Sequence, residues 1–143
     1  MPNDIPLDSD DEKQRAMIER LKAFGALRVM VIDDEPAICK IIGVYLKEIG
    51  FTSLCLTEID DLERHVEDFD PEFVIADVQL PGEDDFAAIG TVQKSKSEGG
   101  SNVPILAIST GDHADQSRVL GAYAYLQKPI TPEGLFVALD QMM

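Results

Sequence analysis

The sequence predicts an α/β fold, in which helices cover both faces of a five-stranded parallel sheet. Short apolar segments with strand-like composition alternate along the chain with segments whose apolar residues recur at helical spacing. The strand segments are apolar almost throughout, which indicates burial on both faces and therefore a parallel sheet. The length of 143 residues suits about one domain.

Residues 1–26 precede this sheet. Residues 1–12 are acidic, polar and proline-containing, so we expect them to be disordered. The next segment, EKQRAMIERLKAFGAL, predicts a short amphipathic helix that Gly25 ends. Its apolar stripe consists of Met17, Ile18, Leu21 and Phe24. An isolated helix of this length is marginal, so the stripe must dock. We expect a second subunit to take part, which makes a homodimer a candidate; docking on the chain's own core is the alternative.

Residues 27–143 predict one domain, and its first half contains three strands. The strand LRVMVI (27–32) precedes a helix over 36–49, where Pro36 suits the first turn and Gly50 follows the end. The strand TSLCL (52–56) leads to a helix with inward residues between 59 and 69. The third strand, EFVIADV (72–78), is followed by the loop QLPGED and a helix that carries Phe86, Ile89 and Val92.

The second half adds two strands. KSKSEGGSN (94–102) predicts a flexible surface loop, and VPILAIS (103–109) the fourth strand. A brief helical segment ends at Leu120 and leads to the fifth strand, AYAYLQ (122–127). The last helix starts with Thr131 as N-cap and Pro132 at its first position.

Charge and cysteine content limit the function. The chain has 27 acidic and 12 basic residues, a formal charge of −15, which argues against binding nucleic acid or anionic membranes. Divalent cations and basic patches on protein partners are natural counterparts. No apolar run reaches the roughly 18 residues that a membrane span needs, and no signal-peptide pattern is evident, so we expect a cytoplasmic protein. Cys39 and Cys55 are interpreted as core thiols in a reducing compartment, with a disulfide improbable.

Charged and polar residues stand where the predicted strands end. The stretch RVMVIDDEP runs from a buried strand into three consecutive carboxylates, and the other strands of interest also end in polar residues. These residues are Asp33 and Asp34 after the first strand, Asp77 at the third, Ser109 and Thr110 at the fourth, and Lys128 after the fifth. Because parallel strands expose their carboxyl ends on one edge, we expect these side chains to converge.

A cluster of three carboxylates repels itself unless a cation is present, and oxygen ligands suit Mg²⁺ or Mn²⁺. Lys128 and Ser109 then suit a second anion, for which phosphate fits. Each residue by itself has a simpler explanation, such as a turn, a cap or a solvated surface. Their coincidence on one edge favours a joint site. His65 and His113 are interpreted as surface residues, Glu83, Asp84 and Asp85 as a solvated loop, and Gly99-Gly100 as a linker.

Four motifs in order, VIDDEP, IADVQLPGED, PILAIST and YLQKPI, resemble the receiver domain of two-component response regulators, the CheY-like superfamily, over about residues 27–143. The resemblance implies a flavodoxin-like sheet of strand order 2-1-3-4-5. It implies that a histidine kinase or phosphotransfer protein phosphorylates Asp77, and that protein contacts with a downstream target switch as a result.

The resemblance also implies roles for the other site residues. Mg²⁺ would be held by Asp34, Asp77 and the backbone carbonyl of Gln79, with Asp33 acting through a bound water. Ser109 and Lys128 would hold phosphoryl oxygens. Tyr125 would be the aromatic switch residue, and the Lys128–Pro129 peptide would be cis. The roles are carried by Asp33, Asp34, Asp77, Gln79, Ser109, Tyr125 and Lys128.

Two departures from the family pattern stand out. Asp85 takes a position that is usually glycine, so the backbone there is expected to differ. The chain between Ser109 and Lys128 is about three residues short, which predicts a shortened helix before the fifth strand. Two other functions remain as alternatives. One is a Mg²⁺-dependent phosphohydrolase with an aspartyl nucleophile, which the adjacent acids at 33–34 fit poorly. The other is a pseudo-receiver scaffold that is never phosphorylated.

Overall fold

A computed structural model describes residues 9–97 and 103–143 and confirms the predicted α/β fold. The strands are β1 (Arg28–Ile32), β2 (Thr52–Leu56), β3 (Phe73–Asp77), β4 (Ile105–Ser109) and β5 (Ala124–Gln127). The helices are α1 (Ser9–Lys22), α2 (Pro36–Glu48), α3 (Leu62–Phe69), α4 (Ala87–Ser97), α5 (Ala114–Val119) and α6 (Pro132–Met142). In the described part of the chain, no helix is both long and apolar enough to span a membrane.

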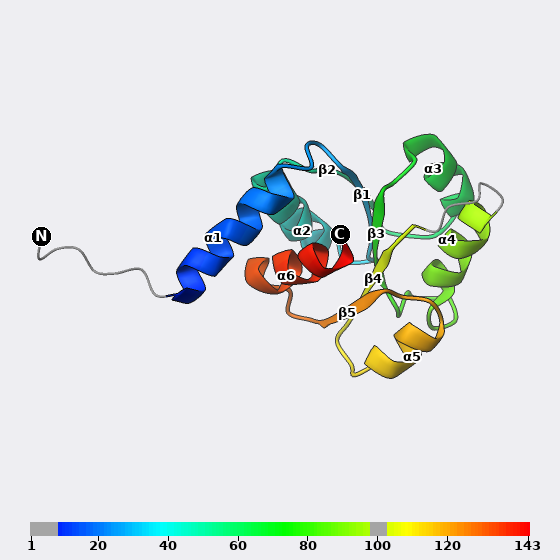
Figure 1. The fold of residues 1–143 in the computed structure, drawn as a ribbon. Coiled ribbons are helices and arrows are strands. Elements are labelled where there is room, and N and C mark those ends of the chain that lie inside the picture. Colours follow the sequence, from blue (N-terminus) through cyan, green and yellow to red (C-terminus); the bar gives the residue numbers. More distant parts are fainter. Residues whose placement is uncertain (1–8, 98–102) are drawn as a thin grey trace, which may run out of the picture.

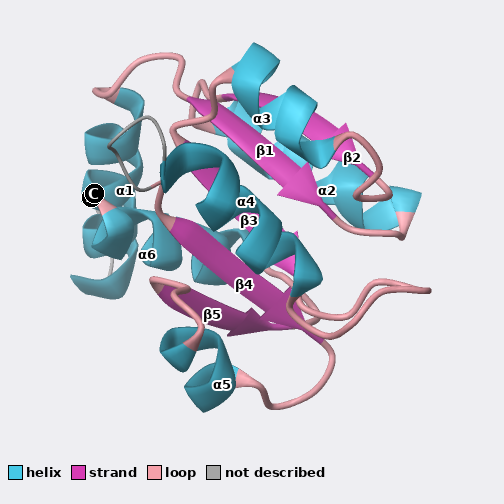
Figure 2. Cartoon of the chain, turned by 90° about the vertical axis from the view of Figure 1, so that its right-hand side faces the viewer, coloured by secondary structure: helices cyan, strands magenta, loops and turns pink. Residues whose placement is uncertain are grey.

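The sheet is parallel and has the strand order β2-β1-β3-β4-β5, as the resemblance implied. Helices α1, α2 and α6 lie on one side of it, and α3, α4 and α5 lie on the other (Figure 1). Figure 2, which is turned by 90°, shows the strands pointing the same way beneath α3, α4 and α5. The arrangement brings the carboxyl ends of all five strands to one edge.

Alternate residues of the strands enter two separate apolar cores. On β1, Val29 and Val31 face the core beneath α1, α2 and α6, whereas Met30 and Ile32 face the core beneath α3 and α4. All four are fully buried. Burial on both faces is the reason that these strands read as continuous apolar runs rather than alternating patterns.

The N-terminal helix packs on its own domain. Met17 and Leu21 are buried in the core that α6 shares, with Leu21 fully inaccessible, and Ile18 packs beside them. The Arg20 guanidinium donates to the Asp140 carboxylate of α6 at 2.9 and 3.3 Å. Phe24, predicted to belong to the buried stripe, is instead 54% exposed. Met17, Ile18 and Leu21 therefore dock on the chain's own core beside α6, which is the alternative expectation, whereas the part of a second subunit stays a prediction.

Several boundaries differ from the sequence-based expectation. Disorder was expected over 1–12, but residues 9–12 belong to α1, and residues 1–8 lie outside the described residues. The flexible loop expected over 94–102 is wrong for 94–97, which continue α4; residues 98–102 lie outside the described part. The brief helix expected before the fifth strand is confirmed, since α5 has six residues, and its shortening relative to the family pattern stays a prediction. The cap at Thr131 is also confirmed: its hydroxyl accepts from the Gly134 N–H at 3.1 Å.

The expectation about the two cysteines is wrong. Cys39, in the first half of α2, and Cys55, on β2, form a disulfide, and their Cα atoms are 5.8 Å apart. Cys55 is also exposed rather than part of the core. The pairing follows from α2 packing across β2, a tertiary contact that the sequence spacing of the two residues does not reveal.

Candidate functional site

The carboxyl edge of the sheet brings together the residues that the strand ends predicted. Asp33 follows β1, Asp77 ends β3, Ser109 ends β4, and Lys128 follows β5. The strand register places them side by side, because Ile32 pairs with Ala76, Asp77 with Ile108 and Ser109 with Gln127. The backbone N–H of Lys128 also donates to the Ser109 carbonyl at 2.7 Å, which extends the β4–β5 pairing by one residue.

Three of these side chains fold their own loops back on the strand ends. In each case a side-chain oxygen accepts a hydrogen bond from the backbone N–H two residues further on, the usual local turn of Asp and Ser. The pairs are Asp33 Oδ1 with Glu35 N (2.9 Å), Asp77 Oδ1 with Gln79 N (2.8 Å) and Ser109 Oγ with Gly111 N (3.1 Å). This arrangement leaves Oδ2 of both aspartates pointing to other partners.

Lys128 is the partner that both aspartates share. Its Nζ lies 2.8 Å from Asp77 Oδ2 and 2.7 Å from Asp33 Oδ2, and the lysine side chain is only 7% exposed. Glu35 Oε1 is further away, at 3.7 Å, and that side chain is 56% exposed. The Asp77 contact is a hydrogen bond. The Asp33 contact is an ion pair, and Asp33 Oδ2 makes no hydrogen bond in addition to it.

Burial and opposite charges act against each other on these groups. Burial raises the pKa of Asp33 above its ordinary value, although Lys128 and the Glu35 N–H partly offset it. Burial would lower the pKa of Lys128, but its contacts with Asp33 and Asp77 outweigh this and raise the pKa to about 12. Lys128 is therefore charged at neutral pH and neutralises only one of the two buried carboxylates.

A second cation fits beside this lysine. Carboxylate oxygens of Asp33, Asp34 and Glu35 lie within 4.8 Å of one another, and all are hard oxygen donors of the kind that Mg²⁺ and Mn²⁺ prefer. Asp33 Oδ2, buried without a hydrogen bond, is an oxygen that such an ion can satisfy. The metal ligands predicted from the sequence include Asp33 and Asp34 of this acidic cluster but not Glu35. The third predicted carboxylate, on Asp77, is held by Lys128 in the structure.

Tyr125 connects the site to the loop after β4. Its hydroxyl donates to the Gly111 carbonyl and accepts from the His113 N–H at 3.3 Å. His113 is half-buried, and its ring packs edge-on against Phe86 with centroids 5.9 Å apart. His113 is therefore a partly exposed residue, and the contact of its ring with Phe86 is the feature that the sequence-based interpretation lacks. His65 is also only half-exposed. Nothing in the residue pattern around His113 signals its contact with Phe86, because the contact is tertiary.

The loop after Asp77 has an unusual backbone at Phe86. This residue has a φ of 67°, in the left-handed region that non-glycine residues rarely adopt. Its N–H donates to the Val78 carbonyl at 2.6 Å, which closes the loop over residues 78–86. The left-handed residue is therefore one position beyond Asp85, where the sequence lacks the expected glycine. The Lys128–Pro129 peptide is cis, as the resemblance implied.

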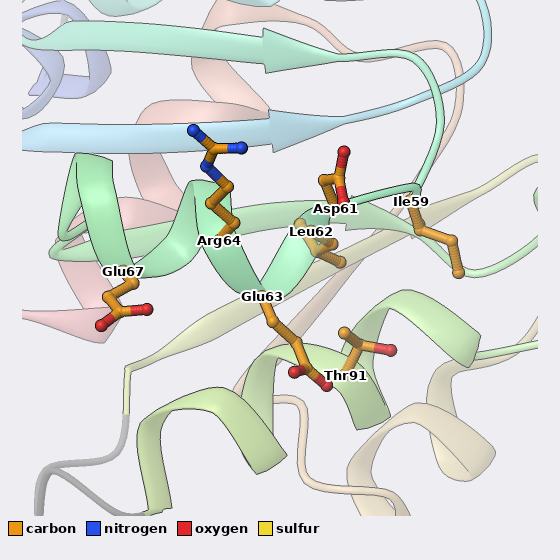
Figure 3. Close-up of a pocket in the computed structure, with 7 residues that line it drawn as sticks. All are labelled: Ile59, Asp61, Leu62, Glu63, Arg64, Glu67 and Thr91. Atoms are coloured by element: carbon orange, nitrogen blue, oxygen red, sulfur yellow. The ribbon is translucent and has the colours of Figure 1, made fainter.

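A different hollow lies between α3 and α4 (Figure 3). Its lining includes Asp61, Glu63 and Glu67, with Arg64 and Thr91, and Figure 3 shows Glu63 reaching down toward Thr91 of α4. None of the strand-end residues that contact Lys128 is part of this lining. The hollow is therefore separate from the candidate site.

The fold and this edge define a class: doubly wound α/β proteins with an acidic cluster and a buried lysine at the carboxyl ends of the strands. A family model described as "response regulator receiver domain" matches residues 29–140. The chain belongs to that family, which belongs to two-component systems.

Known proteins agree with this assignment. The chain is 31% identical over 117 residues to response regulator protein GraR of Staphylococcus epidermidis, covering 80% of this chain and 50% of GraR. It is 30% identical over 111 residues to the probable transcriptional regulator ycf27 of Guillardia theta, covering 76% of this chain and 42% of that protein. The chain thus spans about half the length of these relatives, or slightly less.

Solved structures share the fold. Chemotaxis protein CheY4 of Vibrio cholerae superposes with a TM-score of 0.72 at 20% identity, covering 83% of this chain and 100% of that one. The BeF3-activated N-terminal receiver domain of RstA from Klebsiella pneumoniae gives a TM-score of 0.68 at 22% identity, with coverages of 80% and 96%. The family match begins at residue 29, so α1 lies outside it.

Proposed function

We propose that residues 27–143 act as a phosphoacceptor switch in which Asp77 receives a phosphoryl group from a histidine kinase or phosphotransfer protein. The observation that carries this proposal is the position of Asp77: it is a buried carboxylate at the carboxyl edge, 2.8 Å from a charged lysine and beside the acidic group of β1. Membership of the receiver family supports the same role.

In the proposed reaction, a carboxylate oxygen of Asp77 attacks the phosphorus of a phosphohistidine. The P–N bond breaks, the imidazole nitrogen leaves with the electron pair, and an aspartyl phosphate forms. Lys128 is already in contact with Asp77, and its ammonium group then donates to a phosphoryl oxygen. The Ser109 hydroxyl donates to another phosphoryl oxygen. These two groups make contacts that strengthen as negative charge develops, which is how they assist transfer.

Mg²⁺, or Mn²⁺ in its place, would be held by Asp33, Asp34 and Asp77 with the carbonyl of Gln79, and it would supply charge neutralisation for the incoming phosphoryl group. Two findings support a cation here: the adjacent carboxylates are uncompensated by Lys128 alone, and Asp33 Oδ2 lacks a hydrogen bond. Glu35, whose oxygen lies in the same group, is an additional candidate ligand.

The output is proposed to be a change in protein contacts, transmitted by Tyr125. The formal charge of −15 on the whole chain makes direct binding of nucleic acid unfavourable, so the partners are proteins: a kinase or phosphotransfer protein and a downstream target. We propose that the chain works in the cytoplasm and assists its own phosphorylation and dephosphorylation rather than turning over a separate substrate.

Mass spectrometry of the intact chain after incubation with acetyl phosphate tests the proposal. With Mg²⁺ present, we expect one phosphoryl group per chain, labile to base. With a chelator in excess, we expect the labelling rate to fall by at least about 10²-fold, because an uncompensated acidic cluster repels the incoming anion. Labelling that is indifferent to the chelator would contradict the metal assignment, and absence of labelling in Mg²⁺ would favour a pseudo-receiver.

A further inference from the structure

The Cys39–Cys55 disulfide has one buried and one exposed end. Cys39 lies in α2 and is 6% exposed, whereas Cys55 lies on β2, the strand at the edge of the sheet, and is exposed. The two residues are 16 apart in the sequence, and their Cα separation of 5.8 Å is the spacing at which disulfides normally form. The backbone therefore places the two cysteines at a separation that a disulfide spans.

We propose that Cys39 and Cys55 are a reversible redox site, which dithiol reductants open and small-molecule disulfides close. A reductant can reach Cys55 because its side chain is exposed on the edge strand of the sheet, and access to a sulfur is what thiol–disulfide exchange requires. Disulfides inside cells are mostly transient and regulatory, which agrees with the proposed cytoplasmic location. The inference itself does not depend on the phosphoacceptor role.

The exchange conserves atoms and electrons. A thiolate of the reductant attacks Cys55 Sγ, the S–S bond breaks, and Cys39 leaves as a thiolate that takes a proton from water. The second thiol of the reductant then attacks the mixed disulfide, which releases Cys55 and leaves the reductant as a disulfide. Two electrons pass from the dithiol to the protein. A small-molecule disulfide, such as glutathione disulfide, runs the sequence in the opposite direction.

Reduction reaches the acidic cluster through Cys39. The Cys39 Sγ lies 3.5 Å from the backbone carbonyl oxygen of Asp33, within range of a sulfur hydrogen bond. A disulfide sulfur carries no hydrogen, whereas a thiol can donate one. Reduction therefore adds a weak donor aimed at the carbonyl of the residue whose carboxylate contacts Lys128 at 2.7 Å. Reduction also removes the covalent link between α2 and β2. We therefore expect the segment 33–39 to change most between the two redox states.

The test compares the full chain after equilibration with dithiothreitol or with glutathione disulfide. We expect an alkylating reagent to label two thiols in the reduced protein and none in the oxidised one, without a mixed disulfide in the mass spectrum. We expect the oxidised form to melt about 6–12 °C higher, because the disulfide restricts the unfolded chain between residues 39 and 55. The amide signals between residues 33 and 39, other than at Pro36, should shift between the two states. None of these readouts uses phosphorylation.

The control is Cys55→Ser, at an exposed position that tolerates the change, with Cys55→Ala as a second variant. Both should fold, melt like the reduced wild type and show no shift at 33–39 on oxidation. Two labelled thiols under both conditions would overturn the proposal, because no bond would form. A bond that dithiothreitol cannot open in the folded chain would overturn its reversibility. An oxidation-dependent shift that persists in the variants would overturn the assignment to this pair.

Discussion

At the scale of single residues, the site depends on a charge imbalance around Lys128. One ammonium group lies within 2.8 Å of two buried carboxylates, so the buried set carries one excess negative charge. The pKa of Asp33 is raised chiefly because burial penalises its charged form, and the neighbouring charge of Asp77 adds a smaller contribution. A site with excess negative charge beside a buried lysine favours a divalent ion first and an anion second.

The two pKa shifts act on stability in opposite directions at neutral pH. The pKa of Lys128 is raised from 10.5 to about 12. Its contribution to the stability of the fold is therefore fully present below pH 10.5 and is lost as pH rises through about 12. The pKa of Asp33 is raised above 3.8. Its contribution to the stability of the fold is therefore fully present below pH 3.8 and is lost as pH rises through the raised pKa. At pH 7, therefore, Lys128 stabilises the fold and buried Asp33 opposes it.

Replacing Lys128 tests this balance. Lys128→Met leaves Asp33 and Asp77 buried without a cation, so we expect a loss of about 2–4 kcal/mol in unfolding free energy at pH 7. The loss should shrink at pH 4, because protonation removes the repulsion. Urea unfolding at both pH values measures it. Lys40→Met, at an exposed position on α2, is the matched control, with a change within about 0.5 kcal/mol. A deficit that is equal at both pH values would contradict the electrostatic explanation.

At this scale, the strand ends could be predicted and the side-chain partners could not. A polar residue directly after a buried strand is visible in the sequence, and so Asp33, Asp77, Ser109 and Lys128 were found. Glu35, by contrast, looks like an acidic helix start. The contacts of His113 with Phe86 and of Cys39 with Cys55 depend on how helices and loops pack. Pairings of that kind are set by tertiary geometry, and residue types and spacing do not encode them.

At the scale of elements, α1 is the addition to the receiver fold. It packs along α6, with Leu21 fully buried between them and the Arg20–Asp140 pair at the rim. Exposed ion pairs contribute little, so the apolar contact must hold the helix. The sequence predicts the helix and its apolar stripe, but it does not determine which surface buries that stripe. An apolar stripe can pack against any apolar surface within reach.

A pair of substitutions measures the docking of α1. Leu21→Ala removes a side chain from a fully buried position, and we expect it to cost about 2–4 kcal/mol of unfolding free energy. Phe24→Ala, on the same predicted stripe but 54% exposed, should change it by less than about 1 kcal/mol. Urea unfolding followed by circular dichroism gives both values. Equal losses, or a larger loss for Phe24→Ala, would mean that α1 docks through a different face.

At the scale of the whole molecule, a short chain of hydrogen bonds joins the site to β5. Ser109 Oγ accepts from the Gly111 N–H, and the Gly111 carbonyl accepts from the Tyr125 hydroxyl. If Ser109 turns to donate to a phosphoryl oxygen, the Gly111 N–H loses its partner and the Tyr125 contact must readjust. This gives the proposed switch a path from the acidic edge to a surface near α5.

A phosphoryl mimic tests this path. Beryllofluoride with Mg²⁺ should shift the amide signals of Ser109, Gly111 and His113, and Tyr125→Phe should weaken the shift at Gly111 and His113 while leaving the one at Ser109. Tyr123→Phe, at a residue that is 60% exposed, should respond as the wild type does. An identical response from both variants would show that the Tyr125 hydroxyl does not carry the signal.

The overall architecture was the most predictable feature. Continuous apolar strands such as FVIAD on β3, buried at every residue, can exist only with a layer on each side. Element ends were less predictable: α4 runs on through Ser97 where lysines and serines suggested a loop, because these residues tolerate helix when neighbouring turns hold it. Strand order came from the resemblance and not from the residues.

The central claim is that Asp77 is the phosphoacceptor, and labelling of one variant tests it most directly. Asp77→Asn and Asp84→Asn are incubated with acetyl phosphate and Mg²⁺, and the intact chains are weighed. Asp84 is an exposed residue of the loop that follows Asp77, so it matches the charge change without touching Lys128. We predict one base-labile phosphoryl group on Asp84→Asn and none on Asp77→Asn. Undiminished labelling of Asp77→Asn would contradict the account.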